Sequence, residues 1–250
     1  MLLIRTQAIL LHKRDFSDTS LIAVFFTKNS GKLHFIIKGA KQPKTSFMGS
    51  FEHGSCYEIL YRHSSRKQGL ITLRQAHLVE AFSRIRADLH AFYHAVYCLE
   101  LLDAFTELED SDESLFNLIF TTLRQMDESL KNPLPNIEWM IRSFEVKLLS
   151  HLGFLGNLSS CFSCRESFRD LLFLDHRTAR LLCEKCTQTK TYPFHVQSIQ
   201  LIPLLMRAEP CTPVDKGAEE KKELKNLLWF YIDFHLGKPL KSRKFLIEKI

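Results

Sequence analysis

The feature that most constrains the fold of this chain is a pair of Cys-x-x-Cys motifs, Cys161–Cys164 and Cys183–Cys186, with eighteen residues between them. Two such motifs at this separation are typical of zinc modules, because each turn offers two thiolates at a spacing that suits a tetrahedral ion. We expect Cys161, Cys164, Cys183 and Cys186 to bind one Zn²⁺. Four thiolates leave no position for water, so the ion would be structural. The predicted module covers about residues 158–190.

An alternative is that the two motifs are unbound and redox-active, but no thioredoxin-like βαβ pattern surrounds either of them. The N-terminus lacks the long apolar segment of a signal peptide, and no run reaches the roughly 18 apolar residues that span a bilayer. These observations predict a cytoplasmic protein with no membrane partner. In a reducing compartment, its seven cysteines are expected to bind metal or to remain thiols.

Residues 2–80 read as five short strands, because β-branched and aromatic residues recur between turn signals. Five strands with loops of this length predict a small Greek-key barrel of the OB-fold type. The expected strands are Leu2–His12, Leu21–Thr27, Lys32–Lys38, Phe51–Arg62 and Leu70–His77.

Aromatic residues in this segment have two possible uses. Phe35, Phe47, Tyr57 and Tyr61 can stack on bases, as aromatics do in such barrels, or they can pack in the core. The third strand alternates cleanly, which places Phe35 on its apolar face and leaves a basic face opposite. For Tyr57 and Tyr61 we favour packing.

From Phe82 onward the period of apolar residues changes from two to about 3.6. We therefore predict one long helix over Phe82–Leu108 and further helices near Ser114–Leu130, 136–153, 195–208 and 219–236. Asn136 is a good N-cap, and Gly237 suits a helix C-cap. The predicted fold class is multidomain α+β. An OB-fold domain covers 1–80, and a helical domain over 81–250 contains the zinc module.

Charge is distributed unevenly along the chain. Residues 1–80 carry +7, residues 81–160 carry −6 and residues 161–250 carry +5. A basic first segment favours a polyanionic partner. The cations expected to contact DNA phosphates are Arg5, Lys13, Arg14, Lys32, Lys38, Lys41, Lys44, Arg62, Arg66 and Lys67.

Common catalytic motifs for nucleotides, proteases and hydrolases are missing, so we predict that the chain is not an enzyme. One alternative is a magnesium-dependent nuclease that uses the acidic residues between Asp103 and Glu113. Carboxylates at a helix end are more often solvated. A second alternative is a zinc-ribbon factor that binds RNA or acts in transcription.

Several passages in order resemble the RecO family of bacterial recombination mediators. The N-terminal passages resemble the family's barrel, the double Cys-x-x-Cys resembles its zinc motif, and two C-terminal passages resemble its final signature. The N-terminal ones are Thr6–Leu11, Phe16–Asp18, Phe26–Thr27, Gly31–Lys32 and Lys38–Lys41, and the C-terminal ones are His235–Gly237 and Lys241–Arg243.

The resemblance implies an N-terminal OB-fold followed by helices and an embedded zinc module. It also implies binding of single- and double-stranded DNA, annealing of complementary strands, and help in loading the RecA recombinase. The partners that it implies are RecR and the tail of single-strand-binding protein, in a nucleoid-associated protein. Two features depart from the family: Gln42, Thr45 and Ser46 replace frequent arginines, and a glycine pair before Cys183 is missing.

Overall fold

The computed structural model describes residues 2–42, 47, 51–62, 70–131, 136–188, 193–207 and 217–247. The chain divides into two compact units. Unit 1 comprises Met1–Pro135 together with Leu240–Ile250, and unit 2 comprises Asn136–Pro239. The predicted boundary at residue 80 marks where strands give way to helices, and as a domain boundary it stays a prediction.

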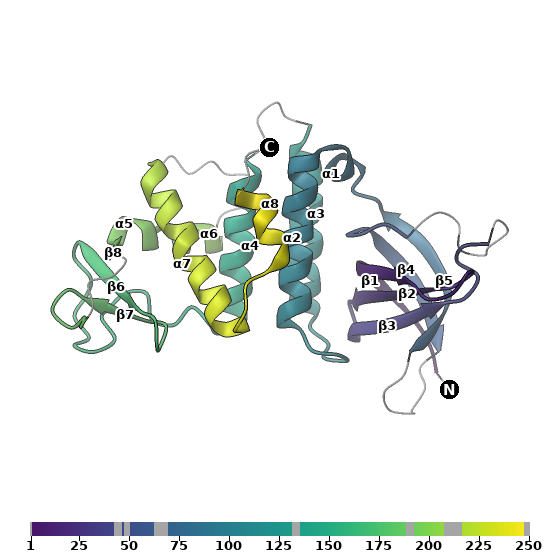
Figure 1. Cartoon of the computed structure of the whole chain (residues 1–250), viewed down its shortest axis with the longest axis horizontal. Coiled ribbons are helices and arrows are strands. Elements are labelled where there is room, and N and C mark those ends of the chain that lie inside the picture. Colours follow the sequence, from purple (N-terminus) through teal and green to yellow (C-terminus); the bar gives the residue numbers. More distant parts are fainter. Residues whose placement is uncertain are drawn as a thin grey trace. The chain divides into compact units, whose positions relative to one another are not determined.

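Unit 1 begins with a closed barrel of five strands in the order β1-β2-β3-β5-β4 (Figure 1). All neighbouring strands are antiparallel except β3 and β5, which are parallel. This is the arrangement of an OB-fold, so the predicted fold class is confirmed. The strands are β1 Leu3–Asp15, β2 Leu21–Thr27, β3 Gly31–Ile37, β4 Cys56–Arg62 and β5 Ile71–Glu80.

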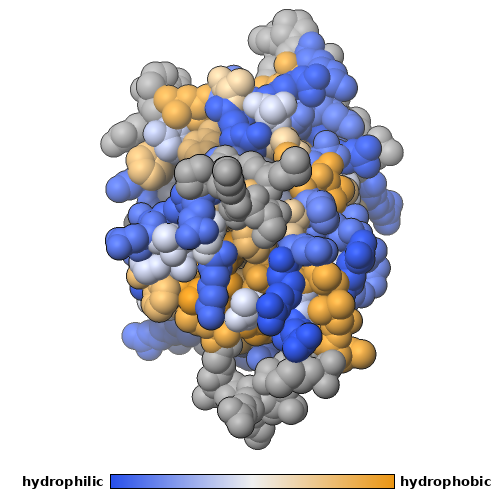
Figure 2. Space-filling model, turned by 90° about the vertical axis from the view of Figure 1, so that its right-hand side faces the viewer, coloured by the Kyte–Doolittle hydropathy of each residue, from blue (hydrophilic) through white to orange (hydrophobic). Residues whose placement is uncertain are grey.

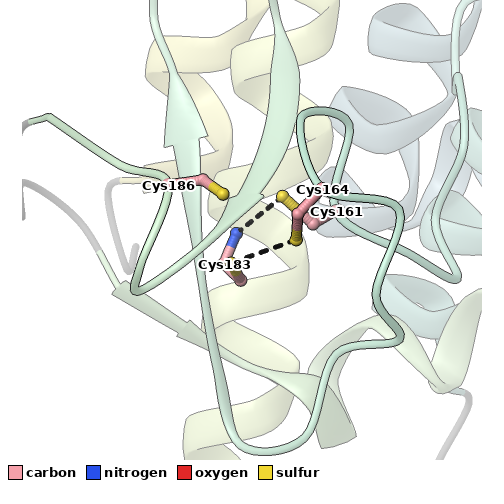
Figure 3. Close-up of side chains that lie close together, drawn as sticks. All are labelled: Cys161, Cys164, Cys183 and Cys186. Atoms are coloured by element: carbon pink, nitrogen blue, oxygen red, sulfur yellow. Dashed lines mark hydrogen bonds between the residues drawn. The ribbon is translucent and has the colours of Figure 1, made fainter.

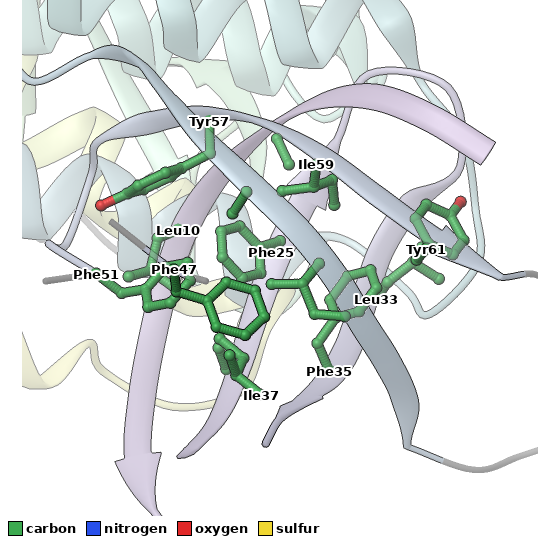
Figure 4. Packing of buried hydrophobic residues seen from close by; sticks show 14 residues of the cluster. Leu10, Phe25, Leu33, Phe35, Ile37, Phe47, Phe51, Tyr57, Ile59 and Tyr61 are labelled. Carbon is green, nitrogen blue, oxygen red and sulfur yellow. The ribbon is translucent and has the colours of Figure 1, made fainter. Parts of the chain in front are cut away.

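Alternation along the strands fills the barrel. In β3, Leu33, Phe35 and Ile37 are buried while Lys32, His34 and Ile36 point outward and are more exposed. Several aromatic rings meet inside the barrel edge to face, such as Phe25 and Phe35 with centroids 5.7 Å apart (Figure 4). Such pairs add about 0.5–1.5 kcal/mol beyond the burial of their surface.

The fourth strand is shorter than predicted. Phe51 is buried in the core, but residues 52–55 form a turn in which Gly54 has a φ of 76°. The left-handed backbone at Gly54 ends the extended conformation, so β4 begins only at Cys56. β1 extends past the predicted end at His12, because its pairing with β2 continues to Asp15, and a register shift between Leu10 and His12 interrupts that ladder.

The prediction of one long helix over Phe82–Leu108 is wrong. The segment forms α1 Ser83–Ala87 and α2 Leu89–Phe105, separated by Asp88. The Asp88 carboxylate accepts the Ala91 N–H at 2.8 Å and so starts a new helix. The start of α1 is held by a residue from another helix, since the Asp127 carboxylate accepts the N–H groups of Arg84 and Ile85.

Unit 1 is completed by α3 Glu113–Ser129 and by the C-terminal turns η1 Lys241–Arg243 and α8 Lys244–Ile247. Glu100 on α2 accepts hydrogen bonds from the backbone of Lys241 and from Ser242. The rings of Tyr93 and Phe245 stack 4.6 Å apart. The C-terminal segment is therefore fastened to α2.

Lys32 on β3 joins the barrel to α2. Its Nζ lies 3.0 Å from Asp103 Oδ1, and His12 Nε2 lies 3.5 Å from Asp103 Oδ2. Next to Lys32, a Cβ on Gly31 would overlap the Asp110 carbonyl, so the backbones approach closely there. Burial alone would raise the pKa of Asp103, but hydrogen bonds and positive charge from His12 and Lys32 lower that pKa to about 2.

Unit 2 contains α4 Ile137–His151, a three-stranded sheet and three further helices. The sheet has the order β7-β6-β8. The strands are β6 Leu171–Asp175, β7 Arg180–Cys183 and β8 Pro193–His195, and the helices are α5 Val196–Ile199, α6 Leu201–Arg207 and α7 Ala218–Leu236. As predicted, Asn136 caps α4, and Gly237 ends α7 with a φ of 67°.

We predict that Asp103→Asn weakens the attachment of β3 to α2 by about 1–2 kcal/mol, because Lys32 is left partly buried without its counter-charge. Hydrogen exchange in peptides covering β3 should quicken by about 5–30-fold at neutral pH. Glu107→Gln, an exposed change just beyond the end of α2, is the control and should have no effect.

The effect should also depend on pH. A carboxylate whose pKa is lowered in the folded state adds stability above its unfolded pKa of about 4, and this stability is lost as the pH falls through about 2. The difference between wild type and Asp103→Asn should therefore shrink in acid. A difference that stays constant from pH 7 to pH 3 would rule out the ion pair as its source.

Candidate functional site

The four cysteines of the double motif lie in two tight turns of unit 2. Cys161 and Cys164 belong to a turn in which the Arg165 N–H donates to the Cys161 carbonyl at 3.0 Å. Cys183 ends β7, and the turn after it brings the Cys186 N–H to the Cys183 carbonyl at 3.1 Å. The β6–β7 hairpin therefore carries the second turn back to the first.

The four sulfur atoms form one cluster (Figure 3). All lie within 4.8 Å of one another, and the Cys164 and Cys183 sulfurs are 3.7 Å apart. Zn–S bonds of about 2.3 Å in a tetrahedron require sulfurs about 3.8 Å apart, so the cluster fits such an ion. The Cys183 N–H also donates to the Cys161 sulfur at 3.3 Å and orients it as a ligand.

The pKa values of two thiols in the cluster are shifted in opposite directions. Burial would raise the pKa of Cys161, but N–H groups of Cys164, Cys183 and Ser163 outweigh it and lower the pKa to about 6. The neighbouring Cys183 thiol raises the pKa of Cys186 to about 12. Four thiols this close do not all ionise by themselves, whereas a bound cation would favour the thiolate form of each. These four close cysteines could hold a metal ion.

Exposed cations gather at one end of the barrel, where β1 ends and β2 begins. Arg14 lies opposite Ile22 in the β1–β2 ladder, and Lys38 directly follows the end of β3. The backbone of Lys41 donates to Thr19, and its ammonium pairs with Asp15 at 2.9 Å. Arg14, Lys38 and Lys41 are all exposed. Three of the predicted contacts thus share one rim.

Two more of the cations predicted to contact DNA lie at the opposite end of the barrel, where β1 begins and β4 ends. Arg62 pairs in register with Leu3, and Arg5 lies two residues along β1. Both side chains are exposed, and Arg5 also pairs with Glu58 at 3.0 Å. Surface ion pairs contribute only about 0–1 kcal/mol, so these arginines can exchange such a partner for another anion.

Two of the predicted cations are used inside the fold. The Lys13 ammonium donates to the Phe51 carbonyl, and Lys32 holds Asp103 with a side chain that is only 12% exposed. Lys44, Arg66 and Lys67 lie outside the described residues. The residue types indicate a positive charge at these positions, but they do not distinguish an exposed cation from one that bonds within the fold.

The predicted aromatic residues are not available to stack on bases. Phe35, Phe47, Tyr57 and Tyr61 are all buried in the barrel core. Packing is therefore confirmed for Phe35 and the two tyrosines, and the stacking considered for Phe47 is wrong. The face that carries the barrel shows hydrophilic side chains interspersed with apolar patches (Figure 2).

The acidic segment considered for a nuclease has structural uses. Asp103 pairs with Lys32, Asp112 caps α3 by accepting the Leu115 N–H at 2.9 Å, and Glu113 pairs with Lys28 at 3.3 Å. Among the described residues, the cysteine cluster is the one group with the geometry of a metal site. No helix in the described ranges is long and apolar enough to cross a membrane.

Comparisons with known proteins cover nearly the whole chain. Residues 1–82 match the family model "Recombination protein O N terminal", and residues 86–244 match "Recombination protein O C terminal". A "DNA repair protein RecO" of Alkaliphilus metalliredigens is 31% identical over 74% of this chain and 72% of its own length. One of Shouchella clausii is 29% identical over 98% of this chain and 94% of its own length.

The matched family consists of recombination mediators and not of enzymes. Its N-terminal model covers the OB-fold barrel, and its C-terminal model covers the cysteine cluster. The order of barrel, helices and double Cys-x-x-Cys that the structure displays agrees with this match. The chain belongs to the RecO family of DNA repair proteins.

Proposed function

We propose that this chain binds single- and double-stranded DNA through its barrel, anneals complementary strands and helps to load RecA onto DNA coated by single-strand-binding protein. The observation that carries the proposal is the placement of exposed cations on the OB-fold. Arg14, Lys38 and Lys41 share one rim, and Arg5 and Arg62 lie at the other end of the barrel, where β1 begins and β4 ends. Lys13 and Lys32 are left out because, unlike the other cations, both are partly buried where they bond to their own chain.

The exposed side chains of the barrel favour DNA binding through phosphate contacts over binding through base stacking. The four aromatic residues considered for stacking are buried, whereas cations such as Arg14 and Lys38 are exposed. Binding through such groups is independent of sequence and weakens with salt, because condensed counterions are released from the DNA. A protein that pairs any complementary strands needs binding of this kind.

The double variant Arg14→Glu/Lys38→Glu should weaken binding to single-stranded DNA. Each phosphate contact on a single strand contributes about 0.7 to the slope of log K against log salt, so the slope should become shallower by about 1.4. Fluorescence anisotropy of a labelled oligonucleotide over a salt series measures this. The control is Lys222→Glu, an exposed change on α7 that should leave the slope unaltered.

Wild-type affinity and slope in the double variant would overturn the assignment of this rim. The annealing step is tested by mixing complementary oligonucleotides, with and without a coat of single-strand-binding protein. Faster pairing with the wild type than with the double variant is expected in both cases. If RNA of the same sequence outcompetes DNA, the RNA-binding alternative replaces the proposal.

We also propose that the cysteine cluster binds one structural Zn²⁺ through Cys161, Cys164, Cys183 and Cys186. The support is the fit of the sulfur spacing to a tetrahedron and the N–H bond to the Cys161 sulfur. A bound zinc ion would join the two turns as a crosslink. The chain's own contribution is to hold the sulfurs in place through the β6–β7 hairpin.

Cys164→Ser should lower the zinc content of the purified chain well below one ion per molecule. Apparent zinc affinities of such modules are worth about 10–16 kcal/mol, so loss of the ion should expose residues 158–188 to protease. Elemental analysis and limited proteolysis with mass spectrometry measure both effects. Ser167→Ala, in the same module, is the control, and unchanged metal content and protease resistance in Cys164→Ser would contradict the site.

The proposed partners are RecR and the acidic tail of single-strand-binding protein, and the proposed location is the cytoplasm, in association with the nucleoid. These proposals rest on membership of the family. Co-purification of the untagged partners with this chain tests the two interactions. Fluorescence microscopy of a tagged chain tests the location.

A further inference from the structure

The cysteine module carries two arginine side chains that pack on one phenylalanine ring. Arg180 Cζ lies 3.6 Å from the centroid of the Phe162 ring, and Arg165 Cζ lies 5.0 Å from it. Phe162 stands between the two cysteines of the first turn, whereas Arg180 comes from β7. The Phe162 N–H donates to the Leu181 carbonyl at 2.9 Å, so the ring and both arginines share one scaffold.

Arg165 adopts a backbone conformation that favours glycine. Its φ is 66°, and for a residue with a side chain this left-handed region costs about 1–2 kcal/mol. A glycine could make the same turn, whose N–H bond to Cys161 uses only the backbone. The strain indicates that the side chain of Arg165 has a use beyond the turn itself.

The nearest acidic residue in the ladder does not neutralise Arg180. Asp175 lies opposite Arg180 in the β6–β7 register, but its carboxylate accepts hydrogen bonds from the Thr178 hydroxyl and the Arg177 N–H. Arg165 and Arg180 are exposed, and neither forms an ion pair with a residue that the structure describes. Both guanidinium groups therefore keep N–H donors for an acceptor outside the chain.

We propose that Phe162, Arg165 and Arg180 form a second nucleic-acid contact that binds phosphodiester groups of a single strand. A guanidinium donates two parallel hydrogen bonds to a phosphate, and stacking on an aromatic ring fixes its orientation beforehand. Less side-chain entropy is then lost on binding. The inference rests on the proposed DNA binding and adds a contact made by residues of unit 2.

An alternative role for the two arginines is to compensate the charge of a zinc–thiolate site, and it predicts a different experimental result. A Zn²⁺ ion with four thiolates carries two net negative charges, and nearby arginines could serve only to compensate them. In that case removal of the arginines would lower the retention of zinc and leave the interaction with DNA unchanged. The experiment therefore measures metal content and DNA binding on the same samples.

The test compares the full-length, zinc-loaded wild type with Arg165→Ala/Arg180→Ala. The probe is a fluorescent oligothymidylate of about 20 nucleotides, long enough to reach beyond one OB-fold. Loss of two phosphate contacts should make the slope of log K against log salt shallower by about 1.4, with zinc content unchanged. The matched control is Arg169→Ala/Arg177→Ala, which removes the same charge from exposed positions of the same module.

The inference is overturned if Arg165→Ala/Arg180→Ala keeps the wild-type slope, or changes it no more than the control does. Photocrosslinking of wild type to a bromouracil oligonucleotide gives an answer that does not depend on how the variants fold. A crosslinked peptide that contains Phe162 supports the contact, and crosslinks confined to the barrel contradict it. If the wild type binds no DNA at all, the proposed function fails. If the wild type binds DNA and the variant keeps its salt slope, only the contact on unit 2 fails.

Discussion

Closing five strands into a barrel forces alternate side chains into a space too small for water, and this constraint determines which residues remain outside for other uses. On β3, Phe35 fills the interior while Lys32 and His34 face outward. Burial of each large apolar side chain contributes about 1.5–3 kcal/mol, so the aromatic rings on the inner face of the strands stabilise the core. The barrel's outer surface carries exposed cations among exposed apolar residues such as Phe16, and it is the cations that the proposed DNA binding uses.

The helices that follow the barrel supply the opposite charge. Asp103 and Glu113 pair with Lys32 and Lys28 of the barrel, and Asp112 caps α3. Some of the acidic residues in the middle of the sequence therefore stabilise unit 1. Among the described residues, Arg14 and Lys38 at one rim have no such partner, and both are left to face a polyanion.

Patterns of period and spacing predicted much of this structure. Alternation gave the five strands, and the double Cys-x-x-Cys predicted a cluster that the sulfur distances agree with. Three-dimensional contacts were harder to predict. The start of α1 depends on Asp127 from another helix, and the burial of Lys32 depends on Asp103, 71 residues away. The Arg165 and Arg180 pair on Phe162 was also missed, although an arginine directly after Cys164, where the turn suits glycine, was a visible signal.

The central claim is that outward cations of this chain bind nucleic-acid phosphates. The most direct measurement is the affinity of the wild type for a single-stranded oligonucleotide over a series of salt concentrations. Five barrel contacts, from Arg5, Arg14, Lys38, Lys41 and Arg62, predict a slope of log K against log salt of about −3.5, and the contact on unit 2 would steepen it. No binding in dilute buffer, or binding that does not change with salt, would contradict the account.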